Sequence, residues 1–319
     1  MFTLSTAFCL RSQSYNFPTI WKTWQYIPII TTEPPITTEP VLSEAPVTTL
    51  PFVDIEPANS FRIIVSATVD AILAEAMPYS SEKKKLYTSQ DFIGLIFERN
   101  PDVWCAEMDF TGCSPWNSYD GPRRAGTLVT PRHIIFSSHY AIPTNATIVF
   151  VTSANEVISR TVIATKLALN DVTVGLLDSD LPASIKPYKV LPKNYRNYIG
   201  SGSPVVVLDQ EEKAIIAFDI GTLTNITLEG NLYLSCYAAP TSAVEIPWGE
   251  ELISGDSGNP TFFYIDNELV LASVHFGPWY GVSIGKHFDT INSTIEQLGG
   301  GYTLMPKSLS AYPMILNID

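Results

Sequence analysis

The chain of 319 residues has few cysteines, few basic residues and no long apolar run. Its four cysteines are Cys9, Cys105, Cys113 and Cys236, and none forms a C-x-x-C pair, so a zinc or thiol redox site is not expected. The formal net charge of -13 argues against a nucleic-acid or anionic-membrane partner. No stretch reaches the roughly 18 apolar residues that a membrane-spanning helix requires.

The scarcity of cysteine leaves two alternatives for Cys105 and Cys113, which could close a small loop as a disulfide or remain free buried thiols. Three N-x-S/T sequons could carry glycans in a secreted chain, although chance matches are common in a Thr-rich chain; they begin at Asn145, Asn225 and Asn292. The apolar run from Phe2 to Leu10 lacks the basic start of a signal peptide. The location therefore stays open, with a secreted or surface-associated protein favoured over others.

The amino-acid composition favours an all-β fold. Hydrophobic residues make up 45% of the chain and charged residues 16%, and the apolar runs are short, β-branched and separated by turn residues. Residues 31–51 differ from the rest, because they form a Thr/Pro/Glu-rich tract that predicts an extended linker. This tract separates an N-terminal segment of unknown role, residues 1–30, from a folded domain at 52–319.

The folded domain divides into an extension and two groups of strands. Residues 52–119 predict a helical N-terminal extension, with helices over Val69–Met77 and Gln90–Arg99. Residues 120–195 and 196–300 each hold about six short β-type runs, which predicts either paired antiparallel barrels or a sandwich. The last strand expected in the first group is Tyr188–Leu191. A C-terminal helix is predicted from Phe288 to Leu298, ended by three glycines.

Three residues with chemical potential lie at the ends of predicted strands or in turns. Ser257 lies between Asp256 and Gly258 in a glycine-rich turn, which could equally be an ordinary surface turn. His139 follows an apolar run and the small residues Ser137 and Ser138, which give the ring room to turn toward a neighbour. Asp171 precedes an apolar strand and is either a strand-initiating cap or a buried acceptor for an imidazole. His133, which follows Pro131 and Arg132, is interpreted as a turn residue.

The order and local contexts of these three residues resemble the chymotrypsin/trypsin family of serine peptidases. The segment from Gly126 to His139, the pair Asn170-Asp171 before its strand, and Gly255-Asp-Ser-Gly-Asn-Pro260 each resemble a motif of that family. The resemblance covers roughly residues 120–300 and implies an all-β fold of two antiparallel six-stranded Greek-key barrels. It also implies a serine endopeptidase that forms an acyl-enzyme on a polypeptide substrate.

The resemblance also implies a role for each residue. Ser257 would be the nucleophile, His139 the general base and Asp171 the residue that fixes the imidazole tautomer. The backbone N–H groups of Gly255 and Ser257 would form the oxyanion hole. No metal or organic cofactor is required. The alternative is a catalytically silent binding or structural module with the same double barrel, tethered by the Thr/Pro linker.

Some positions depart from the family pattern. Tyr140 and Ile253 stand where many members carry cysteines, which suggests a bacterial, viral or otherwise divergent branch. No activation site is evident, so Asp256 would need an internal hydrogen-bond donor in place of a new amino terminus.

Substrate preference gives conflicting indications. By family position Glu251 would lie on the floor of the specificity pocket and select Lys or Arg. His275, on a strand that continues to Gly277, would instead select Glu or Gln. A third possibility is a mixed pocket in which neither residue contacts the substrate.

Overall fold

The computed structural model describes residues 60–91, 93–115, 124–226 and 232–315, and for residues 221–226 and 232–233 it describes the backbone alone. The N-terminal segment predicted at 1–30 and the linker predicted at 31–51 lie outside the described residues. The described residues belong to one compact unit that begins at Glu56. The division of this unit into an extension and two halves stays a prediction.

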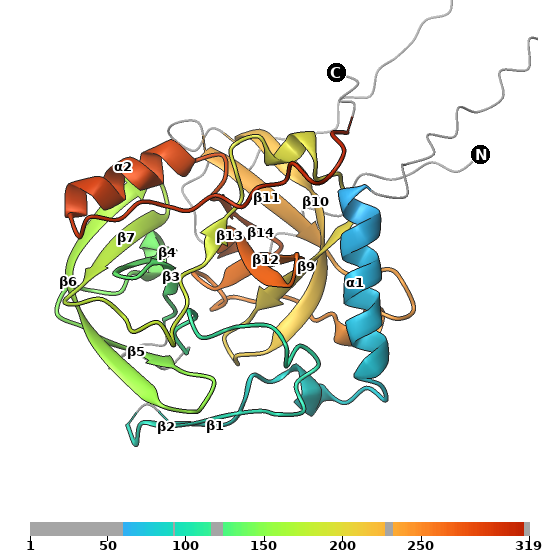
Figure 1. The fold of residues 1–319 in the computed structure, drawn as a ribbon, viewed down its shortest axis with the longest axis horizontal. Helices are drawn as coiled ribbons and strands as arrows, with labels where there is room; N and C mark the ends of the chain where they lie inside the picture. Colours follow the sequence, from blue (N-terminus) through green and yellow to red (C-terminus); the bar gives the residue numbers. More distant parts are fainter. Residues whose placement is uncertain (1–59, 92, 116–123, 227–231, 316–319) are drawn as a thin grey trace, which may run out of the picture. The chain divides into compact units, whose positions relative to one another are not determined.

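The first half of the domain is a five-stranded antiparallel sheet in the order β3-β4-β7-β6-β5 (Figure 1). Its strands are β3 (Thr127–Thr130), β4 (His133–Ser137), β5 (Thr147–Val151), β6 (Val157–Leu169) and β7 (Val172–Leu177). The sheet curls around its own cluster of fully buried apolar side chains, among them Leu128, Ile134 and Phe136. The described residues give this sheet one strand fewer than the six predicted.

The second half is a closed barrel. Its strands are β9 (Ser203–Leu208), β10 (Ala214–Ile226), β11 (Leu232–Ala238), β12 (Pro260–Ile265), β13 (Glu268–Gly277) and β14 (Tyr280–Ser283). Within the described residues they pair in the order β12-β9-β10-β11-β14-β13, and an additional pairing of β12 with β13 closes the ring. The all-β fold expected from the sequence is therefore confirmed, with one closed six-stranded barrel and one five-stranded half-barrel.

One predicted strand belongs to a different sheet from the one expected. The run at Tyr188–Leu191 contains the two-residue strand β8 (Lys189–Val190), which pairs in parallel with Val270 and Leu271 of β13. The prediction placed it as an antiparallel strand of the first barrel. Its backbone instead joins the second sheet, and Val190 also accepts a hydrogen bond from the Lys307 N–H at 2.9 Å.

The N-terminal extension contains one of the two predicted helices. Helix α1 (Phe61–Glu75) begins earlier than predicted, because the Ser60 side chain caps it and its apolar stripe starts at Phe61. The helix packs against β9 and β12 (Figure 1). A short turn of 3-10 helix, η1 (Ser81–Lys84), follows it.

The prediction of a second helix at Gln90–Arg99 is wrong. This stretch is a hairpin of β1 (Tyr87–Asp91) and β2 (Ile96–Arg99), in which Gln90 pairs with Phe97. Long-range contacts override local helix propensity here. The Phe97 ring packs on the Tyr87 ring, and the Arg99 side chain donates to the carbonyl oxygens of Val151 and Thr152.

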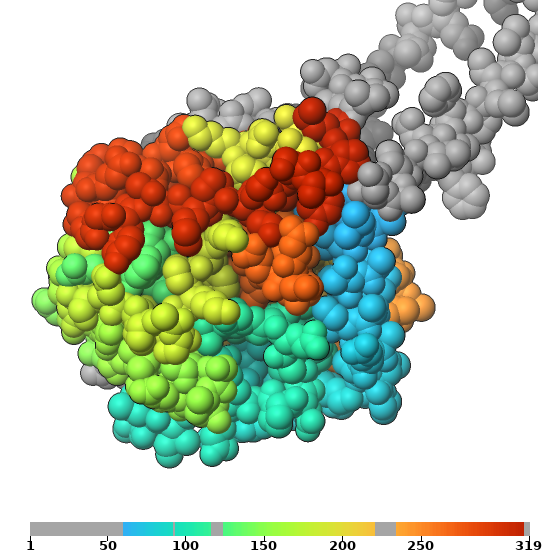
Figure 2. Space-filling model, in the orientation of Figure 1, coloured from blue at the N-terminus to red at the C-terminus, as the bar shows by residue number. Residues whose placement is uncertain are grey.

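Helix α2 (Phe288–Leu298) has the predicted bounds and ends at Gly299, whose φ of 90° suits glycine. It packs on β6 and β7. The segment after it runs along the surface toward α1 (Figure 2), where the Tyr312 ring lies 5.1 Å from that of Phe61. The other short helical turns are η2 (Ser138–Tyr140), η3 (Tyr195–Asn197) and η4 (Ile246–Trp248). None of the helices in the described residues is long and apolar enough to span a membrane.

Candidate active site

The pairing of β4 with β7 brings His139 and Asp171 together. Ser137 at the end of β4 lies opposite Val172 at the start of β7, and the Ser138 N–H donates to the Asp171 carbonyl at 3.1 Å. Asp171 occupies the tight turn between β6 and β7, with a φ of 63°. Asp tolerates this left-handed conformation better than most residues, so the sequence fits the turn.

The Asp171 carboxylate is held on both oxygens. Its Oδ1 accepts from the His139 backbone N–H at 2.8 Å and lies 2.6 Å from His139 Nδ1. Its Oδ2 accepts from the Ser137 hydroxyl at 2.7 Å. The Asp171 side chain is only 6% exposed, whereas that of His139 is 46% exposed. A buried carboxylate thus orients an imidazole that still faces solvent.

His139 also reaches the serine of the glycine-rich turn. Its Nε2 lies 2.8 Å from Ser257 Oγ, across a sequence separation of 118 residues. The Phe276 ring of β13 stands edge-on to the imidazole, with ring centroids 5.8 Å apart and an interplanar angle of 85°. The three residues singled out in the sequence therefore form one continuous hydrogen-bonded chain, Ser257–His139–Asp171.

The loop that carries Ser257 is fixed by backbone contacts. Gly255 and Gly258 have φ angles of 110° and 89°, which a side chain would disfavour. The Gly258 N–H donates to the His275 carbonyl, and the His275 N–H donates to the Asn259 carbonyl, each at 2.9 Å. Asn259, which stands where the resemblance leads to glycine, is buried and donates through Nδ2 to the Asp256 carbonyl at 3.3 Å.

Asp256 has the internal donors that its position requires. Its Oδ1 accepts from the Gln210 N–H at 2.9 Å, and its Oδ2 accepts from the Ile253 N–H at 2.6 Å. Burial raises the pKa of Asp256, as do the nearby charges of Glu250 and Glu211, while the two backbone donors oppose the rise. The loop is therefore anchored by backbone N–H groups of this chain.

A second buried carboxylate lies beside this anchor. Asp209 accepts from the N–H groups of Glu211 and Lys213 at 2.8 and 2.9 Å. Burial, with a smaller contribution from the Asp256 charge, raises the pKa of Asp209 to about 6 despite these donors. The turn between β9 and β10 thus places the buried Asp209 carboxylate close to the Asp256 carboxylate of the Ser257 loop.

The predicted oxyanion donors lie in the same loop. Within the part of the chain that the structure describes, neither the Gly255 N–H nor the Ser257 N–H donates to a protein acceptor. The Gln210 side chain covers Gly255, since a Cβ built there would lie 2.6 Å from Gln210 Oε1. The assignment of these two N–H groups to an oxyanion hole stays a prediction.

The predicted specificity residues occupy different environments. Glu251 is exposed, and its neighbour Glu250 instead forms ion pairs with Lys84 and Lys213 at 2.7 Å each. His275 is only 1% exposed, with Nε2 3.3 Å from Thr261 Oγ1. Burial lowers the pKa of His275 to about 4, so the ring is neutral at pH 7. The space beside Gly277 is filled by the Tyr280 ring, which a Cβ would meet at 2.6 Å.

The interpretation of His133 as a turn residue is wrong. His133 begins β4, is fully buried, and its Nδ1 lies 2.7 Å from Thr130 Oγ1. Burial lowers its pKa to about 4. Of the two alternatives for Cys105 and Cys113, the structure has free buried thiols.

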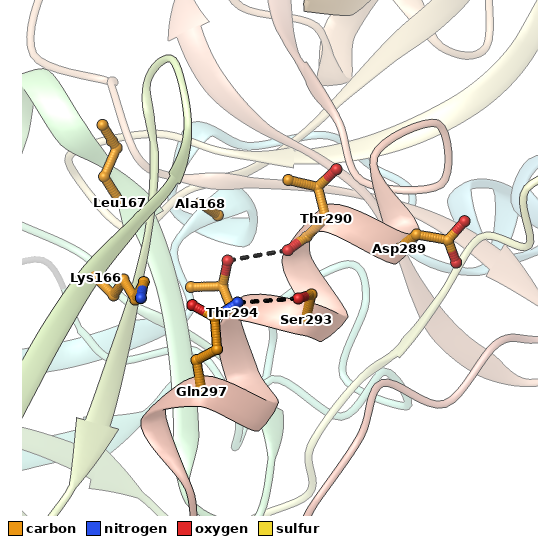
Figure 3. A pocket seen from close by; sticks show the side chains of 8 residues that line it. All are labelled: Lys166, Leu167, Ala168, Asp289, Thr290, Ser293, Thr294 and Gln297. Atoms are coloured by element: carbon orange, nitrogen blue, oxygen red, sulfur yellow. Dashed lines mark hydrogen bonds between the residues drawn. The ribbon is translucent and has the colours of Figure 1, made fainter.

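An open hollow lies away from this site, between β6 and α2 (Figure 3). Polar side chains of α2 line it, but they hydrogen-bond within the helix: Thr294 Oγ1 to the Thr290 carbonyl at 2.9 Å and Gln297 Nε2 to Ser293 Oγ at 3.1 Å (Figure 3). Their polar groups are satisfied locally, so the hollow is not a candidate active site. The described residues hold no cluster of three or more side chains suited to a metal ion.

No family model and no curated protein matches the chain. Among solved structures, a mutant of human heparin binding protein (CAP37) is similar, with 12% sequence identity and a TM-score of 0.42, over 61% of this chain and 96% of that one. The similarity is too low to carry a function from that protein to this chain.

Proposed function

We propose that this protein is a serine endopeptidase that hydrolyses peptide bonds through the triad Ser257, His139 and Asp171. The observation that carries the proposal is the chain of contacts from Ser257 Oγ to His139 Nε2 at 2.8 Å and from His139 Nδ1 to Asp171 Oδ1 at 2.6 Å. A nucleophile, a base and a residue that orients the base are the three parts that covalent acyl transfer needs.

The acylation step follows from this geometry. Ser257 Oγ attacks the carbonyl carbon of the scissile peptide, and His139 Nε2 takes the hydroxyl proton. Asp171 accepts from the Nδ1 proton, so it keeps the Nε2 lone pair directed at Ser257 and stabilises the imidazolium that forms. His139 then gives its proton to the leaving amine, and the C–N bond breaks to leave an ester on Ser257.

The oxyanion of the tetrahedral intermediate lies against the N–H groups of Gly255 and Ser257. Each such donor contributes on the order of 3 kcal/mol to the transition state. Deacylation repeats the sequence with water in place of the serine hydroxyl, and His139 again acts as the base. No step calls for a metal ion or an organic cofactor. The partner is a polypeptide substrate.

The Asp256 anchor supports an active loop in the uncleaved chain. The two backbone donors from Gln210 and Ile253 already hold the carboxylate, so the loop that forms the oxyanion hole needs no new amino terminus. The alternative function, a silent binding or structural module with the same fold, would not need the alignment of Ser257 with His139.

Peptide hydrolysis by matched serine variants tests the proposal. Ser257→Ala is compared with Ser254→Ala, which alters an exposed serine in the same turn. We expect Ser257→Ala to remove nearly all turnover of a fluorescence-quenched peptide mixture while Ser254→Ala keeps it. Equal turnover by Ser257→Ala and the unmodified chain would reject the triad, and an unmodified chain without turnover would favour the silent module.

A further inference from the structure

Ser137 is a residue of the site whose hydroxyl takes no part in the proposed steps of acyl transfer. It ends β4, two positions before His139, and is fully buried. Its Oγ donates to Asp171 Oδ2 at 2.7 Å and lies 2.7 Å from His139 Nδ1. One hydroxyl therefore touches both the acid and the base.

The direction of these hydrogen bonds follows from the chemistry of the groups. An ionised carboxylate only accepts, so the single Ser137 proton is directed at Asp171. The lone pairs of Ser137 Oγ then face His139 Nδ1, which must be the protonated nitrogen. Ser137 and Asp171 Oδ1 together surround that proton, and both favour the tautomer whose Nε2 can accept from Ser257.

Ser137 also contacts the loop of the nucleophile. A Cβ built on Gly258 would lie 3.5 Å from the Ser137 backbone nitrogen and 3.6 Å from its Cβ, so the two residues are in close packing. The imidazole also has an apolar neighbour, Phe276, whose ring stands edge-on to it. Within the described residues, Asp171 Oδ2 has Ser137 as its one hydrogen-bond donor.

We propose that Ser137 is a positioning residue that holds Asp171 and the Nδ1 proton of His139 in the arrangement that proton transfer requires. This inference rests on the proposed peptidase function. Strand β4 therefore positions two groups. It leads directly into the turn that carries His139, and its last residue, Ser137, donates to Asp171. The next residue offers a contrast: the Ser138 hydroxyl pairs with Thr173 Oγ1 at 2.8 Å and touches neither triad side chain.

Ser137→Ala and Ser138→Ala are therefore matched variants. Each removes one hydroxyl from adjacent residues of the same segment. Ser137→Ala loses the contacts with Asp171 and His139, and Ser138→Ala loses the contact with Thr173. With active sites counted by covalent titration, we expect Ser137→Ala to lower kcat about 10- to 100-fold, the effect of losing one hydrogen bond to a charged group, with little change in KM. We expect Ser138→Ala to stay within about twofold of the unmodified chain, since its hydrogen bond is between neutral groups.

The second readout is the proton NMR signal of His139 Nδ1, which does not depend on turnover. A proton held between two oxygens resonates far downfield, and we expect Ser137→Ala to move or broaden this signal while Ser138→Ala leaves it in place. An unmoved signal, or equal kcat in the two variants, overturns the role of Ser137. If the unmodified chain neither reacts with the covalent titrant nor hydrolyses peptides, the proposed peptidase function fails. The NMR comparison then tests the contact between Ser137 and His139 Nδ1 by itself.

Discussion

Asp256 accepts a hydrogen bond from the backbone N–H of Gln210 at 2.9 Å, so the turn between β9 and β10 holds the loop that carries Ser257. The Ile253 N–H holds the other carboxylate oxygen at 2.6 Å. Both donors belong to the backbone of the folded domain. The conformation of the nucleophile loop is therefore part of the fold.

The first prediction concerns activation. We expect the uncleaved chain to be active, and Asp256→Asn to lower kcat/KM at least about tenfold, because an amide nitrogen would face one of the two N–H donors. The measurement is peptide turnover by protein whose intact mass is verified before and after the assay. Activity that appears only after a proteolytic cut within the domain would contradict the internal anchor.

The second prediction concerns the coupling of the triad. We expect His139→Ala to reduce kcat about as severely as Ser257→Ala. Among the described residues, Ser257 Oγ has no second base within hydrogen-bond distance to take its proton. The double variant should be hardly slower than either single variant, because residues that act as a unit give non-additive losses. Steady-state kinetics of the three variants provide the check. Losses that multiply would mean that Ser257 and His139 act independently.

The sequence was sufficient to single out Ser257, His139 and Asp171, which the fold brings into contact, because each lies at a recognisable turn or strand end. The catalytic roles of the three residues stay a proposal. The sequence was not sufficient to predict the role of Ser137. The sequence indicated only that Ser137 is small and leaves room for the His139 ring. Its hydroxyl reaches Asp171 because the strand register places Ser137 opposite Val172, the residue after Asp171. Ser137 ends β4 and His139 lies in the 3-10 turn that follows, so strand alternation alone does not predict that the two side chains meet.

Other features of the fold depend on contacts that no local pattern reveals. The stretch at Gln90–Arg99 has helical character, but Phe97 packs on Tyr87 and the segment forms a hairpin. His133 follows turn residues, yet it is fully buried at the start of β4. The donors to Asp256 are backbone groups, so the sequence letters of Gln210 and Ile253 carry no sign of them.

The third prediction concerns stability against acid. Burial lowers the pKa of His275 from 6.5 to about 4, so its neutral form stabilises the fold fully above pH 6.5, and this contribution is lost as the pH falls to about 4. A shift of this size corresponds to roughly 3 kcal/mol. His133 has the same sign and the same window. Urea unfolding from pH 7.5 to 4 should show a smaller loss of stability for His275→Gln than for the unmodified chain.

The titration of Asp209 changes the free energy of unfolding in the direction opposite to that of the two histidines between about pH 4 and 6. Its pKa is raised from 3.8 to about 6, so its contribution to stability is present below pH 3.8 and is lost as the pH rises through 6. Asp209→Asn keeps the Oδ1 acceptor and removes the titration. The slope of stability against pH should therefore become steeper between pH 4 and 6 in Asp209→Asn. An identical slope in both variants and the unmodified chain would contradict the assignment of these groups.

The fourth prediction concerns substrate preference. Glu251 is exposed, His275 is neutral and buried, and aromatic rings of Phe276 and Tyr280 adjoin Gly277. We therefore expect a peptide library to show an apolar or mixed preference before the cleaved bond, unchanged by Glu251→Gln. Enrichment of Lys or Arg that disappears in Glu251→Gln would restore the interpretation of Glu251 as the pocket floor. Enrichment of Glu or Gln that disappears in His275→Gln would do the same for His275.

Covalent labelling of the unmodified chain by a fluorophosphonate, followed by mass spectrometry of the labelled peptide, tests the central claim most directly. The aligned triad makes Ser257 nucleophilic, so the account predicts a single label on Ser257 that is absent in Ser257→Ala and strongly slowed in His139→Ala. Circular dichroism establishes that each protein is folded. A folded, unlabelled chain, or a label on another serine, would contradict the account.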